Sequence, residues 1–234
     1  MTPWYEGPLV ALTVRARPPD RPGADAESGP DPEHDALTAA ALAVQQSPHA
    51  PTEVHSWPST PGAPAGPVVE AVARSLAGAA AGPLAVAHAP YDLTLLDREL
   101  RRHRNRPLTA YLGHRSLCVV DPVLLDRRLN RTAGRRRLSD LCVDYGVPLR
   151  CGPETEPLAE PLTDPGPAAV ATLALVRALG RHYAPQLGRL TPPVLHALQA
   201  VWYAGEARGS AAWFAPCTQS KSYPAWPLRP VITE

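Results

Sequence analysis

Charged residues of opposite sign gather in two segments of the sequence. Residues 98–137 hold twelve arginines against three acids, a balance of +9 in a chain whose net charge is +1. Residues 20–35 reverse this balance, with six acids against Arg21. Clustered guanidinium groups suit phosphate, which they bind through paired hydrogen bonds, and carboxylates suit hard divalent cations. The two segments favour either a metal-dependent site that acts on a polyanion or ordinary solvated surface.

One short segment combines residue types that are used in catalysis and metal binding with a clear pattern of secondary structure. His88 and Asp92 follow an apolar run, and leucines then recur at helical spacing up to Leu100. Asp92 therefore stands at the entry of a helix, as either a metal-ligating carboxylate or a helix N-cap. His88 is either a contact to a substrate or a satisfied polar residue at the end of a strand.

The elements that must position these residues alternate between strand and helix. Apolar runs of strand length lie at 8–14, 83–89 and 116–120, and an Ala-rich run at 35–44 fits a strand or a helix. Helical patterns occupy 68–80, 92–103, 122–130, 136–145, 168–182 and 193–204. Proline, 30 of 234 residues, concentrates in segments that we interpret as loops near 15–35, 47–67 and 148–167. This alternation predicts the α/β fold class.

Several classes of protein and site are not expected. No apolar run approaches the roughly 18 residues of a membrane span. The first residues lack the basic and apolar regions of a secretory signal, so we expect a cytoplasmic protein without a membrane partner. The four cysteines have no zinc-site spacing, and we expect buried free thiols in preference to two disulfides.

The sequence from Ala85 to Leu100, with its Ala-His-Ala-Pro-Tyr-Asp core, resembles the second motif of the DEDDh (DnaQ-like, RNase T-like) 3′–5′ exonuclease family. Further likenesses are Val119-Val120-Asp121-Pro122, the segment 137–147 and the tail 225–230. The resemblance, best to proofreading exonucleases of the DNA polymerase III epsilon type, implies an RNase H-like mixed sheet flanked by helices. We expect this domain over 1–185, and a helical and irregular extension over 186–234.

The family resemblance also implies a two-metal site for Mg²⁺ or Mn²⁺ in which four carboxylates hold the cations and a His deprotonates the attacking water. Asp92 matches the second-motif aspartate. The first motif is matched by Asp25 and Glu27 only if residues 13–24 are an insertion; read without a gap, its two positions are Thr13 and Arg15. The alternative is that Asp25 and Glu27 belong to an ordinary acidic loop.

The last motif of the family is missing. Its general-base and aspartate positions fall on Thr163 and Ala168, so no catalytic base is assigned, and Asp164 is the nearest late carboxylate. For nucleic-acid contacts the resemblance and the charge pattern point to His88 and six arginines. These are Arg101, Arg102, Arg104, Arg135, Arg136 and Arg137.

Three functions remain open from the sequence. The first is a 3′–5′ exonuclease, active or weak, on DNA or RNA with a free 3′ end. The second is a pseudo-nuclease that binds nucleic acid or a DNA polymerase without hydrolysis. The third is a decaying paralogue with no selected activity.

Overall fold

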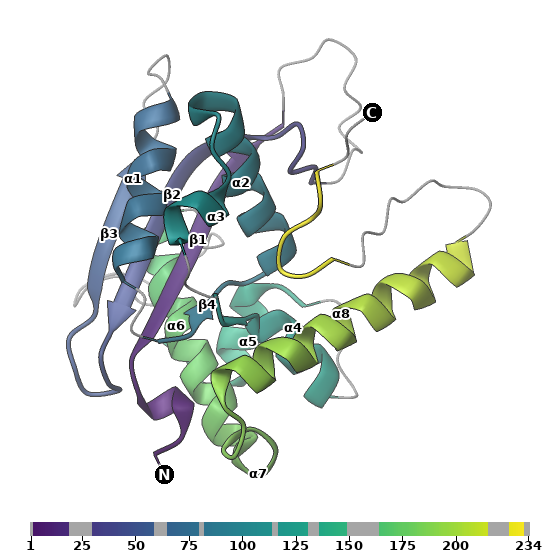
Figure 1. Ribbon diagram of the computed structural model, residues 1–234. Coiled ribbons are helices and arrows are strands. Elements are labelled where there is room, and N and C mark those ends of the chain that lie inside the picture. Colours follow the sequence, from purple (N-terminus) through teal and green to yellow (C-terminus); the bar gives the residue numbers. More distant parts are fainter. Residues whose placement is uncertain are drawn as a thin grey trace.

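One five-stranded mixed sheet, flanked by helices, forms the centre of the computed structural model (Figure 1). The structure describes residues 2–18, 30–58, 65–79, 82–113, 117–130, 136–148, 164–214 and 225–231, with the backbone alone for 208–214. The strands are β1 (Leu9–Arg17), β2 (Ala36–Gln45), β3 (Glu53–Pro58), β4 (Leu84–Ala85) and β5 (Val119–Val120). The helices are a 3₁₀ turn η1 (Trp4–Glu6), α1 (Ala65–Gly78), α2 (Ala89–Arg104), α3 (Leu108–Leu112), α4 (Pro122–Leu129), α5 (Leu138–Asp144), α6 (Pro165–His182), α7 (Ala184–Leu187) and α8 (Pro192–Phe214).

The sheet has the strand order β3-β2-β1-β4-β5. β1 pairs antiparallel with β2 and parallel with β4, while β2–β3 is antiparallel and β4–β5 is parallel. Ala11 is the partner of Ala85, the last residue of β4, so β1 continues for six residues beyond that ladder. The segments that follow β4 and β5 therefore leave the sheet at the same end as the carboxyl end of β1.

The two faces of the sheet bury separate apolar layers. Alternate residues of β1, beginning with Val10 and Leu12, pack with α1, α2 and α3. The intervening residues Leu9 and Ala11 pack with α4, α5 and α6 on the other face. This separation follows from the period of two in a strand, which sends neighbouring side chains to opposite faces.

The predicted α/β class is confirmed, and most expected elements are present. The ambiguous run 35–44 is the strand β2. The loop predicted over 47–67 is wrong in part, because it contains β3, an exposed strand without apolar alternation. Only two residues of each run at 83–89 and 116–120 join the ladder, and the helix expected over 193–204 extends to Phe214. The division of the chain near residue 185 stays a prediction.

Two general expectations concern the thiols and the membrane. Cys142 is a buried free thiol as expected, whereas the free thiol of Cys118 is only partly buried. Cys151 and Cys217 lie outside the described residues. No described helix is both long enough and apolar enough to cross a membrane.

Candidate functional site

Two buried carboxyl groups lie near each other beyond the ends of β4 and β5. Asp92 is in the first turn of α2, which follows β4, and Asp121 directly follows β5. Asp92 is 8% exposed and Asp121 is 3% exposed. Burial raises the pKa of Asp92 well above its usual range, and the charge of Asp121 raises it further. The carboxyl ends of parallel strands are where α/β proteins place their ligand sites.

Asp121 has a structural role that the sequence did not reveal. Its carboxylate accepts the backbone N–H groups of Ala89 at 3.0 Å, Val123 at 2.9 Å and Leu124 at 3.2 Å. Asp121 therefore caps α4 and ties the start of α2 to the end of β5. Burial raises the pKa of this group, but three N–H donors favour its charged form. Of the two carboxyl groups, Asp92 is thus the one that holds a proton more readily.

His88 precedes α2 in a left-handed backbone conformation, with φ at 61°. Few residues other than glycine adopt this conformation, and it is often found at functional sites. The imidazole lies near enough to Asp121 for its charge to lower the pKa of that carboxyl group. The predicted role of His88 as a nucleic-acid contact stays a prediction.

The gap-free reading of the first motif places non-acidic residues on β1. Thr13 continues the row formed by Leu9 and Ala11, on the face that α6 covers, and Thr13 is buried. Arg15 lies close enough to Asp92 for its positive charge to lower the pKa of that group, against the larger effect of burial. Ala168, at the late aspartate position, lies on α6 and is buried in the core.

Of the other predicted metal ligands, the structure describes Asp164 alone. Asp25, Glu27 and the base position Thr163 lie outside the described residues. Asp164 is exposed and caps α6, where its side chain accepts the N–H of Gly166 at 2.9 Å. Within the described part of the chain, no group of three His, Cys, Asp or Glu side chains is arranged to hold a metal ion. The described residues alone therefore do not fit a two-metal site.

The capping role of Asp164 leads to a test. Asp164→Ala is expected to lower the free energy of unfolding by about 1 kcal/mol, because the N–H of Gly166 loses its acceptor. Asp164→Ser, which keeps an N-cap oxygen, is expected to recover most of that loss in urea unfolding. If the two variants are equally destabilised, the carboxylate has a role that a cap does not explain.

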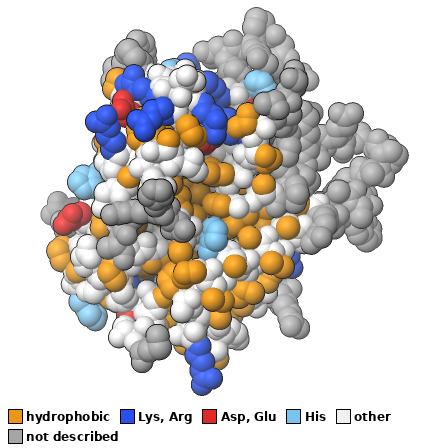
Figure 2. All heavy atoms as spheres, viewed as in Figure 1, with side chains coloured by type: hydrophobic (Ala, Val, Ile, Leu, Met, Phe, Trp, Pro, Cys, Tyr) orange, Lys and Arg blue, Asp and Glu red, His pale blue; other side chains and the backbone are white. Residues whose placement is uncertain are grey.

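Three of the seven predicted nucleic-acid contacts lie far from Asp92. Arg101, Arg102 and Arg104 occupy the last turn of α2, about 14–18 Å from Asp92 at 1.5 Å per residue. Figure 2 shows arginine side chains gathered over this end of α1 and α2. Their carboxylate partners Glu70, Asp97 and Glu99 are more buried than the guanidinium groups, which remain partly exposed.

The remaining predicted arginines are separate from this basic end of α2. Arg136 pairs with Asp126 and Asp144 between α4 and α5. Arg137 precedes α5, and its backbone N–H is bound by Asp140 at 3.0 Å. Arg135 lies outside the described residues.

Arg98 joins three segments that are distant in sequence. Its guanidinium group binds Glu33 at 2.6 and 2.9 Å, Asp97 at 2.8 Å, and the carbonyl oxygens of Arg229 and Pro230. Tyr91 also donates to Asp35 at 2.6 Å. The segment that precedes β2 and the C-terminal segment 225–231 are therefore both held against α2.

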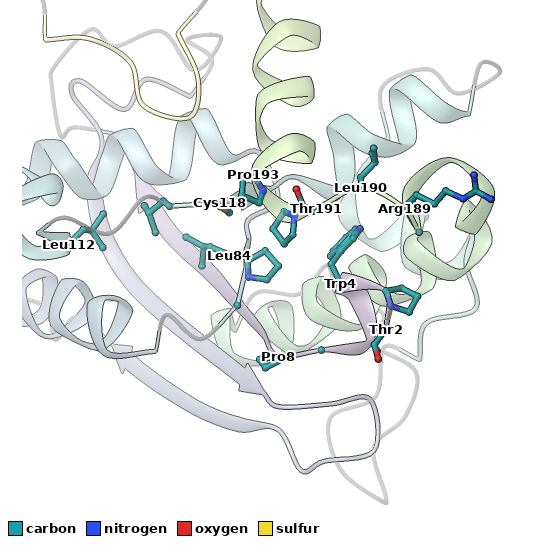
Figure 3. A pocket seen from close by; sticks show the side chains of 17 residues that line it. Thr2, Trp4, Pro8, Leu84, Leu112, Cys118, Arg189, Leu190, Thr191 and Pro193 are labelled. Carbon is teal, nitrogen blue, oxygen red and sulfur yellow. The ribbon is translucent and has the colours of Figure 1, made fainter.

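A cavity lies at the opposite end of the sheet. It has a volume of about 980 Å³ and is lined by Trp4, Pro8, Pro83, Leu84 and Cys118 (Figure 3). Pro8, Pro83 and Cys118 directly precede β1, β4 and β5, so the cavity is at the amino ends of these parallel strands. Arg189 is the one charged residue of the described lining, and Figure 3 shows it extending away from the other labelled side chains. The cavity is thus mostly apolar and separate from Asp92.

Comparison with known proteins gave no relative on which to base a function. No family model matches the chain, and neither a curated protein nor a solved structure matches it.

Proposed function

We propose that the chain is an RNase H-like protein of the DEDDh exonuclease kind that binds nucleic acid and has lost efficient hydrolysis. The mixed sheet flanked by helices and the position of Asp92 on the helix after β4 support the fold assignment. The likeness of residues 85–100 to the second motif of the family supports the relationship. A polymerase partner stays a prediction.

The observation that best supports the loss of hydrolysis is the positive charge of Arg15 near Asp92. A two-metal site needs several carboxylates to hold its cations. Here the charge of Arg15, on the strand where the family has acids, acts on Asp92. A guanidinium group supplies a fixed positive charge beside the carboxyl group and repels a divalent cation. The buried Ala168 offers no ligand on α6.

The observation that supports nucleic-acid binding is the basic end of α2. Arg74, Arg101, Arg102, Arg104 and Arg106 are exposed or partly exposed there, and the acids that pair with the first four are more buried. Arg106 also lies over the ring of Tyr111, 4.7 Å from its centre. Residues 92–100 of α2 are buried, so the proposed contact with nucleic acid is confined to this basic end of the helix.

A second candidate is a weak Mg²⁺- or Mn²⁺-dependent 3′–5′ exonuclease. The contacts Glu33–Arg98 and Asp35–Tyr91 favour it, because they hold the end of the acidic segment 20–35 against α2. Asp25 and Glu27 belong to that same segment. In this case they supply the carboxylates that the described residues lack.

One experiment separates the two candidates. Fluorescence anisotropy with labelled single-stranded DNA and RNA is expected to show binding in EDTA that Asp92→Ala leaves unchanged. Arg101→Gln combined with Arg104→Gln is expected to weaken binding and to reduce the salt slope by about 0.7 for each phosphate that the variant no longer neutralises. The matched control is Arg181→Gln, because Arg181 is an exposed arginine on α6 that pairs with Glu6.

The same samples are then incubated with Mn²⁺, and released nucleotides are measured. No release, together with binding in EDTA, is the expected result. Release that disappears in Asp92→Ala and in Asp25→Ala identifies the weak exonuclease and contradicts the loss of hydrolysis. Absence of binding at low salt contradicts both candidates.

A further inference from the structure

The two edges of the sheet differ in whether their outward backbone groups have hydrogen-bond partners among the described residues. This contrast indicates an interaction surface. At the β5 edge, side chains of α8 take the place of a neighbouring strand. Gln199 accepts the N–H of Asp121 at 2.8 Å and donates to the carbonyl oxygen of Val119 at 3.0 Å. His196 Nδ1 accepts the N–H of Val119 at 3.1 Å. The backbone groups at this edge are therefore satisfied within the chain.

The β3 edge has no such cover among the described residues. β3 is the outermost strand in Figure 1 and pairs with β2 alone. Five of its six residues are exposed, and Val54 is 43% exposed. In an antiparallel pair every second residue turns its N–H and C=O away from its partner strand. No described group binds those outward groups of β3.

The sequence of β3 carries few of the features that prevent pairing between edges. Proteins protect exposed edges with lysines, bulges, prolines or very short strands. The ladder between β2 and β3 has no bulge, the strand has no lysine, and its one proline, Pro58, is the last residue. The edge from Glu53 to Trp57 is therefore available to another extended strand, which binds through main-chain hydrogen bonds.

The side chains of β3 indicate which strand fits. In an antiparallel pair of two β3 strands with its twofold axis at Val54, Glu53 of each copy lies opposite His55 of the other. Opposite residues in such pairs have Cβ atoms about 5 Å apart, within reach of a charge-assisted hydrogen bond. His55 stacks on Trp57, with ring centres 6.2 Å apart, which favours an ordered imidazole on this face. Val54 meets its own copy on the other face.

We propose that the chain forms a twofold dimer in which the β3 strands of two copies pair antiparallel and join their sheets. The proposal is independent of nuclease or binding activity, because β3 contains none of the residues assigned to that function. Two copies of one strand give two Glu53–His55 pairs by symmetry.

The test is the mass of the full chain in solution, measured by light scattering and sedimentation at concentrations up to about 100 µM. The wild type is expected at twice the mass of the chain. His55→Glu puts a second carboxylate opposite Glu53 in both symmetry-related pairs and is expected to weaken the dimer about tenfold. The double variant Glu53→Lys/His55→Glu restores opposite charges and is expected to recover the wild-type dissociation constant. Gln186→Glu, an added negative charge on exposed α7, is the control.

Circular dichroism of each variant distinguishes a dissociated chain from an unfolded one. A wild type that is monomeric at all these concentrations overturns the proposal. A dimer whose dissociation constant is the same in His55→Glu and Gln186→Glu also overturns it, because the two copies then meet elsewhere.

Discussion

Arg177→Ala is expected to lower the free energy of unfolding by about 3–5 kcal/mol, because it removes a buried guanidinium group and leaves its acceptors unpaired. Arg177 is on α6 and is 4% exposed. It donates to the carbonyl oxygens of Tyr5 and Gly7 and to the side chain of Gln45. One side chain thus fastens the start of the chain and the end of β2 to α6.

The neighbouring Arg181 gives a matched control for this prediction. It lies one helical turn later on α6 and pairs with Glu6 in the same N-terminal segment, but it is exposed. Arg181→Ala is therefore expected to cost less than about 1 kcal/mol. Urea unfolding of both variants at neutral pH measures the difference. Equal losses would contradict the prediction, since burial would then not determine the cost.

A conservative variant tests whether geometry or charge alone is important at position 177. Arg177→Lys keeps the charge but has no planar fork with which to reach several acceptors at once. It is expected to recover only part of the lost stability. Full recovery would show that the positive charge is sufficient.

The sequence predicts the buried elements of this fold well, because burial leaves either a periodic apolar pattern in a helix or a continuous apolar run in a strand. α2 and α6 have apolar residues at helical spacing, and β1 is a continuous apolar run. β3 has no such signal, since neither of its faces is buried and its pairing depends on β2. Pairing with a distant strand is a tertiary effect that local composition does not encode.

The candidate site was only partly predictable for a similar reason. Asp92 was identified from its place at a helix entry, and the structure puts it there in a buried position. Asp121 and Arg15 lie near Asp92 because β1, β4 and β5 are parallel, which brings three distant segments to the same end of the sheet. Composition showed that arginines are concentrated over 98–137, but it did not show how far they lie from Asp92. The length of α2 separates its last-turn arginines from Asp92.

Asp92→Asn is expected to raise the free energy of unfolding at neutral pH by about 1–3 kcal/mol, the cost of keeping a charged group buried. Burial raises the pKa of Asp92 above its unfolded value, so the folded state binds a proton more tightly than the unfolded state. Stability of the wild type then falls as pH rises from the unfolded pKa to the folded pKa, and stays lower above it. Asparagine does not titrate and avoids this loss.

The pH dependence distinguishes this cause from a general effect of the substitution. The advantage of Asp92→Asn in urea unfolding is expected to be largest near pH 7 and to shrink as the pH falls toward about 4, where the wild-type carboxyl group is protonated in both states. Asp140→Asn, which keeps an acceptor oxygen for the N–H of Arg137 at the start of α5, is expected to change stability by less than about 0.5 kcal/mol. A loss of stability in Asp92→Asn at pH 7 would mean that the hydrogen bond from the backbone N–H of Val14 and the positive charge of Arg15 together outweigh burial. Arg15→Gln separates these two contributions, because a cost equal to that of Asp92→Asn assigns the effect to the charge of Arg15.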